Sequence, residues 1–158
     1  GKSILVLASM LIQTVLLIAG GVAFFGLKLP ATTEKWWLFV LLLIVGSANS
    51  TALGIAFSAI PKSGRGASAV VSPVVIILQF FSGVFFIFTQ LPHWMQQIAA
   101  LFPLKWLTQG MRQVFLPDSF AIKEVAKSWE TSRGIAINLL WLVLGIALAA
   151  RSFKWERE

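Results

Sequence analysis

The chain contains no cysteine and only one histidine among its 158 residues. The lack of cysteine excludes disulfides, thiol catalysis and thiolate metal ligands, and one histidine cannot supply the ligand cluster that a metal site needs. Charged residues are scarce at 12%, whereas about a quarter of the residues in a soluble domain are charged. Because hydrophobic residues make up 58%, the composition indicates a chain that resides in a lipid bilayer.

Four long apolar runs are candidates for membrane-spanning helices, since about 20 apolar residues are needed to cross a hydrocarbon core of about 30 Å. We predict spans over residues 4–27, 36–60, 67–90 and 134–152. The last run is the shortest, and it becomes long enough if the helix continues past Arg151 with that side chain directed to the membrane surface. The predicted fold is an all-α integral membrane protein with a single membrane domain over residues 1–158.

The segment between the third and fourth runs stays half apolar instead of becoming an ordinary polar loop. In its first part Trp94, Ile98 and Leu101 follow a helical spacing, and Leu107, Met111, Val114 and Phe115 repeat that spacing after Pro103. Proline disfavours helical geometry in the preceding residue, so the chain is predicted to break there. We predict a re-entrant or interfacial pair of amphipathic helices over about residues 93–116. Such a pair either gates the outer mouth of a pathway or anchors the chain in the membrane interface.

A third amphipathic stretch follows over about residues 119–131, with Asp118 or Ser119 as its predicted N-cap. Its apolar stripe and its charged face predict a helix that rests on the membrane surface. We assign no binding role to the charged face, which is usually solvated in such helices.

The net charge of +7 raises the question of a nucleic-acid partner. The basic residues are scattered around the spans and do not gather on one soluble face, so anionic membrane lipid is the predicted partner and nucleic acid is not. Basic residues in the shortest connections favour cytoplasmic termini, but counting the long segment before the last span removes that preference.

Small residues recur every four positions in the second span, at Gly46, Ser50, Gly54 and Ser58. They share one helix face and allow another backbone to approach closely. We predict that this face packs inside one subunit, with a subunit interface or a substrate passage as alternatives.

Three side-chain amides, Gln13, Asn49 and Gln79, fall near the middle of predicted spans. An amide needs a hydrogen-bond partner there because lipid offers none. Interhelical hydrogen bonding is one interpretation, and lining a polar pathway is the other, for which we single out Gln79. No carboxylate lies inside a predicted span, so the chain lacks the buried acid of a proton-coupled pump.

A series of short motifs follows from the third span onward. They are Ser82-Gly83-Val84-Phe85-Phe86, Leu91-Pro92-x-Trp94, Phe102-Pro103-Leu104 and Gly110-Met111-Arg112. The series resembles the C-terminal part of ABC-2 type permeases, a family that includes antibiotic exporters of the daunorubicin type and exporters of lipid-linked glycans. The proline that usually follows the Phe-Phe pair in that family is absent here. By this resemblance the four spans correspond to helices three to six, and two earlier helices are expected to precede Gly1.

The resemblance implies a permease subunit, and not an enzyme, that exports a hydrophobic or amphipathic substrate such as a drug, a lipid or a lipid-linked glycan. It places the chain in the plasma membrane with cytoplasmic termini. A separate cytoplasmic nucleotide-binding ATPase subunit is expected to hold ATP and magnesium, a second permease copy is expected beside this one, and this chain itself is expected to bind no cofactor. The alternative is a non-transporting membrane scaffold or assembly subunit.

The same resemblance, together with the polar residues of the spans, gives the candidate site residues. The predicted substrate pathway comprises Gln13, Asn49, Ser50, Gln79, Phe81, Ser82, Gly83 and Phe85. The predicted outer gate comprises Pro92, Trp94, Pro103 and Arg112. Lys62 and Arg65 are the predicted contact with the ATPase, and no metal site is predicted.

Overall fold

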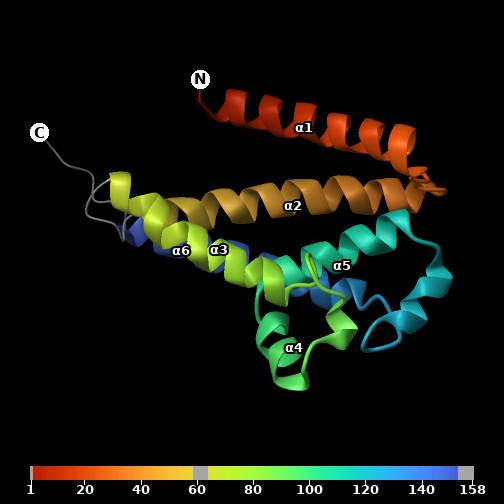
Figure 1. The fold of residues 1–158 in the computed structure, drawn as a ribbon. Helices are drawn as coiled ribbons and strands as arrows, with labels where there is room; N and C mark the ends of the chain where they lie inside the picture. Colours follow the sequence, from red (N-terminus) through yellow and green to blue (C-terminus); the bar gives the residue numbers. More distant parts are fainter. Residues whose placement is uncertain (1, 59–63, 153–158) are drawn as a thin grey trace, which may run out of the picture.

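The computed structural model describes residues 2–58 and 64–152, and residues 1, 59–63 and 153–158 lie outside this description. All regular secondary structure in the described part is helical, as the all-α prediction required (Figure 1). The elements are α1 (Lys2–Phe25), α2 (Thr33–Ser58), α3 (Gly64–Phe81), η1 (Phe88–Gln90), α4 (His93–Ala100), α5 (Pro103–Phe115), η2 (Asp118–Lys123) and α6 (Thr131–Ser152). Here η denotes a 3-10 helix.

Three helices in the described part are long and apolar enough to cross a membrane, over Ala8–Phe25, Thr33–Phe57 and Thr131–Arg151. The predicted span over residues 67–90 is too long, because α3 ends at Phe81 and its apolar stretch covers only Val71–Phe81. The backbone then turns at Gly83, whose φ of 79° belongs to the left-handed region that favours glycine. Apolar residues continue through this turn, so hydropathy alone did not reveal the end of the helix.

Helices α2 and α6 pack against each other over much of their length. Gly145 of α6 allows this approach, since a Cβ atom there would lie 3.1 Å from Cβ of Ala52. Of the small-residue face predicted in the second span, Gly46 packs against Leu107, whereas Ser50 is exposed and Gly54 has open space around it. Among the described residues, the prediction that this face packs within one subunit is therefore wrong for Ser50 and Gly54, and the side chain of Ser58 lies outside the description.

Helix α1 lies on the outside of the group of helices, next to α2 (Figure 1). The hydroxyl of Ser47 in α2 donates a hydrogen bond to the sulfur of Met10 in α1. None of the Ala8–Phe25 window is buried, compared with 28% of the α2 span. An apolar helix surface therefore remains uncovered in the single chain.

Helix α5 packs against α2 through a buried hydrophobic cluster made by Phe39, Leu42 and Val114. The rings of Phe39 and Phe115 meet edge to face with centroids 5.7 Å apart. Gly110 brings the two helices close together, because a Cβ atom there would lie only 2.7 Å from Cδ1 of Leu42. Since the chain direction of α5 opposes that of α2, Leu107 lies against Gly46 while Leu116 lies near Lys35.

The turn between α4 and α5 rests against the middle of α6. The ring of Phe102 stacks on Trp141 with centroids 5.6 Å apart, and the indole Nε1 of Trp141 donates to the carbonyl of Leu101 at 2.7 Å. Pro103 begins α5, and Phe102 before it is extended with φ −101° and ψ 148°, so the predicted break is confirmed.

Two buried asparagines join α2 to α6. Asn49 Nδ2 donates to the main-chain carbonyl of Asn138 at 3.0 Å and to its Oδ1 at 3.3 Å. Asn138 Nδ2 in turn donates to the carbonyl of Gly134 at 2.9 Å. Of the two interpretations of Asn49 drawn from the sequence, interhelical hydrogen bonding is the one these contacts show.

The predicted surface helix over residues 119–131 is wrong. The chain forms only the six-residue 3-10 helix η2, whose N-cap is Pro117, and not Asp118 or Ser119. Asp118 pairs with Lys35 at 3.0 Å, and Glu130 pairs with Arg133 at 2.9 Å. Lys127 and Glu130 have φ values of 54° and 46°, outside the helical region, so the regular charged face expected of an amphipathic helix does not form.

Candidate functional site

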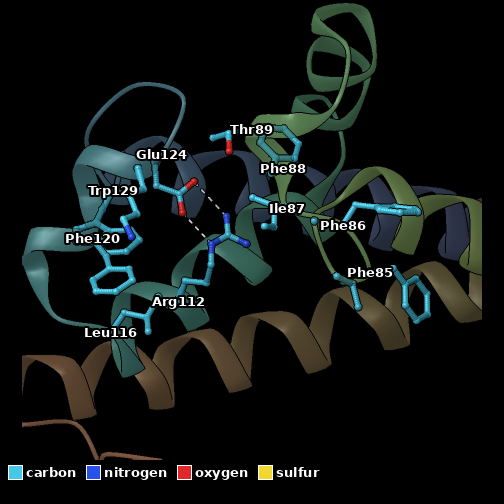
Figure 2. A pocket seen from close by; sticks show the side chains of 13 residues that line it. Phe85, Phe86, Ile87, Phe88, Thr89, Arg112, Leu116, Phe120, Glu124 and Trp129 are labelled. Atoms are coloured by element: carbon cyan, nitrogen blue, oxygen red, sulfur yellow. Dashed lines mark hydrogen bonds and ion pairs between the residues drawn. The ribbon is translucent and has the colours of Figure 1, made fainter.

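A cavity of about 320 Å³ lies between the loop after α3, the outer side of α5 and the segment that precedes α6 (Figure 2). Its lining residues come from these three parts of the chain. They are Gly83, Val84, Phe85, Phe86, Ile87, Phe88, Thr89, Arg112, Leu116, Phe120, Lys123, Glu124 and Trp129. The cavity lies on the same side of the protein as the first turns of α2 and α6. Lys35 in the first turn of α2 donates to the carbonyl of the lining residue Leu116 at 2.8 Å, and the lining residue Trp129 shortly precedes α6, which begins at Thr131.

One wall of the cavity is apolar and is formed by the loop after α3. The ring of Phe80 contacts those of Phe85 and Phe86, with centroids 5.0 and 5.6 Å away. Phe88 is buried, whereas the side chains of Phe85, Phe86 and Ile87 are more than half exposed. Gln96 of α4 holds the end of this loop by donating from Nε2 to the carbonyl of Leu91 at 2.9 Å.

Gly83 determines how closely this loop approaches α5. A Cβ atom at Gly83 would lie 3.1 Å from Cβ of Phe88 and 3.5 Å from Nη1 of Arg112. Glycine is therefore required at this position for two reasons. The backbone φ is positive, and a side chain would fill the space between the loop and α5.

The opposite wall is polar and contains a bidentate ion pair between Arg112 and Glu124. Arg112 Nε lies 2.8 Å from Glu124 Oε1, and Nη2 lies 3.1 Å from Oε2. Figure 2 shows the guanidinium between Glu124 on one side and the Phe85–Phe88 loop on the other. The Glu124 side chain is only 10% exposed, so the paired geometry stabilises a carboxylate that water barely reaches.

Trp129 lies in the polar part of the cavity wall. Its main-chain carbonyl accepts a hydrogen bond from Gln109 Nε2 at 2.7 Å, which ties the segment before α6 to α5. Its indole Nε1 is buried and has no hydrogen-bond partner in the described part of the chain. A buried N–H of this kind costs about 1–3 kcal/mol when nothing accepts from it.

Lys105 lies deeper along α5, with its ammonium stacked on aromatic rings. Its Nζ is 3.3 Å from the centroid of the Trp106 ring and 5.3 Å from that of Phe88. Burial lowers the pKa of Lys105 from 10.5 to about 8, because the carboxylates of Glu130 and Glu124 only partly offset the loss of water. Lys105 is only 4% exposed although it carries a charge.

A profile of the ABC-2 family transporter proteins matches residues 1–150. The chain belongs to the ABC-2 transporter family. No curated protein and no solved structure matches it. Family membership and the apolar helices together make this ABC-2 protein a multi-pass membrane protein and a permease component of a transporter.

The structure brings part of the predicted pathway of this ABC-2 protein together. Gly83 and Phe85 line the cavity, and Phe81 and Ser82 lie immediately before them at the end of α3. The other predicted pathway residues lie elsewhere, on α1, α2 and α3. Gln13 and Ser50 are exposed, Asn49 is buried between α2 and α6, and Gln79 is half-buried on α3.

The residues predicted as an outer gate are also dispersed. Arg112 lines the cavity, and Pro103 is buried where α5 begins. Pro92 and Trp94 lie at the start of α4, where Trp94 is 58% exposed. For the predicted ATPase contact, Lys62 lies outside the described residues, and so does the side chain of Arg65.

The sequence pattern missed the contribution of the segment between α5 and α6. Leu116, Phe120, Lys123, Glu124 and Trp129 complete the cavity of the ABC-2 protein. One signal was available. Arg112 is the only arginine of the predicted amphipathic segment over residues 93–116, which lies next to apolar spans, and such a cation needs a carboxylate. Glu124 is one of only six acidic residues in the chain.

Proposed function

We propose that this chain is the permease subunit of an ATP-driven exporter that moves a hydrophobic or amphipathic substrate out of the cytoplasm. Membership of the ABC-2 family over residues 1–150 supports a transport role. An apolar substrate suits walls in which Phe85, Phe86 and Ile87 remain more than half exposed. Drugs, lipids and lipid-linked glycans all fit this class.

The observation that carries the proposal is the depth that the α4–α5 turn reaches between the spans. Trp141, which holds the turn at Leu101, lies about 15 Å along α6 from its first residue. Gly46, which packs against Leu107, lies about 20 Å along α2 from its first residue. These depths support a re-entrant hairpin that enters the membrane from one side and returns, as expected of an outer gate.

The energy for transport comes, in this proposal, from a cytoplasmic ATPase subunit that binds ATP and magnesium. No carboxylate lies in the central part of the three candidate spans, which argues against a proton-driven route through this chain. Lys62 lies between α2 and α3, and Arg65 is the second residue of α3; we propose these two residues as the contact with acidic groups of the ATPase. This assignment makes that connection and both termini cytoplasmic, in the plasma membrane.

A second permease copy is part of the same proposal. Apolar side chains extend along α1 without cover from the other described residues, with Leu17 76%, Phe24 84% and Phe25 88% exposed. In this proposal, pairing with a second copy removes part of this surface from lipid, and the two copies form the pathway together.

The test is to purify the full-length protein from its native membrane in mild detergent and to identify co-purifying proteins by mass spectrometry. We expect a stoichiometric soluble ATPase. The double variant Lys62→Glu with Arg65→Glu is expected to lose this partner, whereas Lys28→Glu in the opposite connection keeps it. Reproducible absence of an ATPase from the unmodified protein would favour a non-transporting membrane scaffold.

A further inference from the structure

Lys105 of α5 is a buried cation without a hydrogen-bond acceptor. The residue is 4% exposed, and in the part of the chain that the structure describes it makes no hydrogen bond and no ion pair. Its Nζ contacts aromatic rings, 3.3 Å from the centroid of Trp106 and 5.3 Å from that of Phe88. An ammonium carries three donors, and burying them without acceptors is costly. The charge therefore opposes the packing that covers it.

The charged groups that act on Lys105 are already paired with one another. Arg112 Nε lies 2.8 Å from Oε1 of Glu124, and Arg133 Nη1 lies 2.9 Å from Oε1 of Glu130. Burial lowers the pKa of Lys105 more than the two carboxylates raise it, and the two arginines lower it further. Because each carboxylate already has a cation, neither compensates the Lys105 ammonium fully.

Two aromatic rings lie against Lys105, and they are held differently. Trp106 is fixed between α5 and α6, since its Nε1 donates to the carbonyl of Ala100 at 2.8 Å and a Cβ atom at Gly134 would lie 3.2 Å from its ring. Phe88 is 5% exposed but belongs to η1, a 3-10 helix of three residues. Phe88 is therefore the part of the cover that can move away.

Phe88 lies in the segment of residues 84–91, which runs from the turn at Gly83 to Pro92 before α4. Gly83 has a φ of 79°, so the backbone changes direction there. The segment contains no charged side chain and cannot supply a partner for Lys105. Residues 83–89 also form one side of the cavity described above (Figure 2).

The segment has few ties to the rest of the chain. Among the described residues, one side chain makes its hydrogen bonds to another element. Gln96 Nε2 of α4 donates to three carbonyls near the end of the segment, the shortest bond being 2.9 Å to Leu91. Phe85, Phe86 and Ile87 are 59%, 54% and 64% exposed. Segments with so few buried contacts open locally at a lower free energy than the core.

We propose that residues 84–91 form a flap over Lys105, which opens about Gly83 and Pro92 and lets water reach the ammonium. The buried charge favours the open form, and an uncharged side chain at this position keeps the flap closed. Water is near, because Arg133, whose guanidinium lies 5.4 Å from the Trp106 ring, is 64% exposed. This device goes beyond the export function proposed above and depends on the fold alone.

Proton linkage gives the size and the sign of the effect. The pKa of Lys105 is about 8 in the closed structure and 10.5 when unperturbed, so the open form binds the proton more tightly. Protonation therefore increases the opening constant, at most by the ratio of the two acid constants, about 300-fold. Opening is at its highest level below pH 8 and falls as the pH rises toward 10.5.

The test is amide hydrogen exchange of the purified full-length protein in mild detergent, followed by mass spectrometry of peptides that cover residues 84–91. The amides of Gln90 and Leu91 are bonded within η1 and its cap, and so short a helix does not persist once its packing is lost. Below pH 8 we expect Lys105→Met to slow exchange of these amides roughly tenfold or more. Lys105→Arg keeps a charge and should exchange at least as fast as the unmodified protein.

Acetylation of the Lys105 amine by a water-soluble reagent measures the same opening from the covered side. Gln96→Met removes the donor that holds the end of the flap, and we expect faster acetylation of Lys105 in this variant, with the exposed Lys28 as the internal reference. Lys123→Met is the matched control for amide exchange. Its ammonium lies over Phe120 at 4.5 Å and outside the flap, so residues 84–91 should exchange as in the unmodified protein.

Three outcomes would overturn the proposal. Equal exchange in Lys105→Met and the unmodified protein would mean that the buried charge does not act on the flap. Faster exchange in Lys105→Met would mean that the ammonium holds Phe88 in place through its ring. Unchanged acetylation of Lys105 in Gln96→Met would mean that the segment does not cover it. Thermal unfolding in the same detergent confirms that each variant is folded. Neither assay involves ATPase or transport, so failure here leaves the exporter proposal standing, and absence of an ATPase leaves the flap standing.

Discussion

The indole N–H of Trp141 donates to the main-chain carbonyl of Leu101 at 2.7 Å, which joins the middle of α6 to the turn between α4 and α5. The bond satisfies a carbonyl at the end of α4, where the helix leaves it without an intrahelical partner. Phe102 stacks on the same indole, so Trp141 holds the turn by two contacts, beside the hydrogen bond from Trp106 Nε1 to the carbonyl of Ala100 at 2.8 Å.

We expect Trp141→Phe to lose the hydrogen bond but keep a stacking surface for Phe102. The cost should be about 1 kcal/mol, and Trp141→Leu should cost about 1 kcal/mol more because the aromatic pair is lost as well. Thermal unfolding in detergent measures both effects, and amide exchange in the α4–α5 turn should rise in the same order. Trp37→Phe is the control, since Trp37 is 70% exposed. Equal stability of all three variants would show that the turn is held by other contacts.

The two glycines Gly145 and Gly54 give opposite predictions for the same substitution. Leucine at Gly145 must displace Ala52, which a Cβ atom would approach to 3.1 Å, so Gly145→Leu is expected to destabilise the α2–α6 contact by about 1–3 kcal/mol. Gly54 has nothing within 4 Å of its Cβ position, so Gly54→Leu is expected to leave the stability of the single chain unchanged. Unfolding temperature and yield after size-exclusion chromatography compare the two. A loss of stability with Gly54→Leu equal to that with Gly145→Leu would contradict the open position.

The helices and their breaks were largely predictable because their signals are local. Long apolar runs gave α1, α2 and α6, and Pro103 gave the break before α5 through its effect on Phe102. The end of α3 was missed because apolar residues continue through the turn at Gly83. Hydropathy cannot distinguish an apolar loop that folds back on its own helix from an apolar helix that continues.

The cavity was only partly predictable, because half of it depends on a long-range pair. Gly83, Phe85 and Arg112 were found from motifs, but Glu124 and Trp129 belong to a segment interpreted as a surface helix. The apolar and charged residues of that segment have helical spacing by themselves. Pairing of Glu124 with Arg112 and the left-handed conformations at Lys127 and Glu130 override this local preference.

Substitution of Gly83 tests the loop that forms the apolar wall of the cavity. Gly83→Ala is expected to cost about 1–3 kcal/mol, because alanine is strained at a φ of 79° and its Cβ would crowd Phe88 at 3.1 Å. Thermal unfolding reports this loss. Gly20→Ala is the matched control, since Gly20 lies within α1 with nothing within 4 Å and alanine is the better helix former. Identical unfolding of the two variants would argue that the turn at Gly83 relaxes without strain.

An arginine at Gly83 combines this strain with a new charge, so loss of export in Gly83→Arg would not by itself place Gly83 in the pathway.

Lys105 makes the stability of the protein depend on pH in the alkaline range. Its pKa is about 8 in the folded protein and 10.5 when unperturbed, since burial outweighs the attraction of Glu130 and Glu124 and the cations Arg112 and Arg133 oppose protonation as well. Below pH 8 the folded and unfolded chains both hold the proton, and the cost of burying the charge is fully present. Between pH 8 and 10.5 the unfolded chain binds more protons than the folded one, so stability rises with pH.

We expect Lys105→Met to remove this contribution because methionine fills a similar volume without a charge. The variant should be more stable than the unmodified protein below pH 8, and the difference should shrink as the pH rises toward 10.5. Unfolding temperatures of both proteins across this interval in one detergent give the difference directly, so that other titrating groups cancel. Lys28→Met, at an exposed position before α2, should follow the unmodified protein at every pH. If the two unfolding temperatures differed by the same amount at every pH, the Lys105 ammonium would be hydrated in the folded protein. Its stacking on Trp106 would then not require the loss of water.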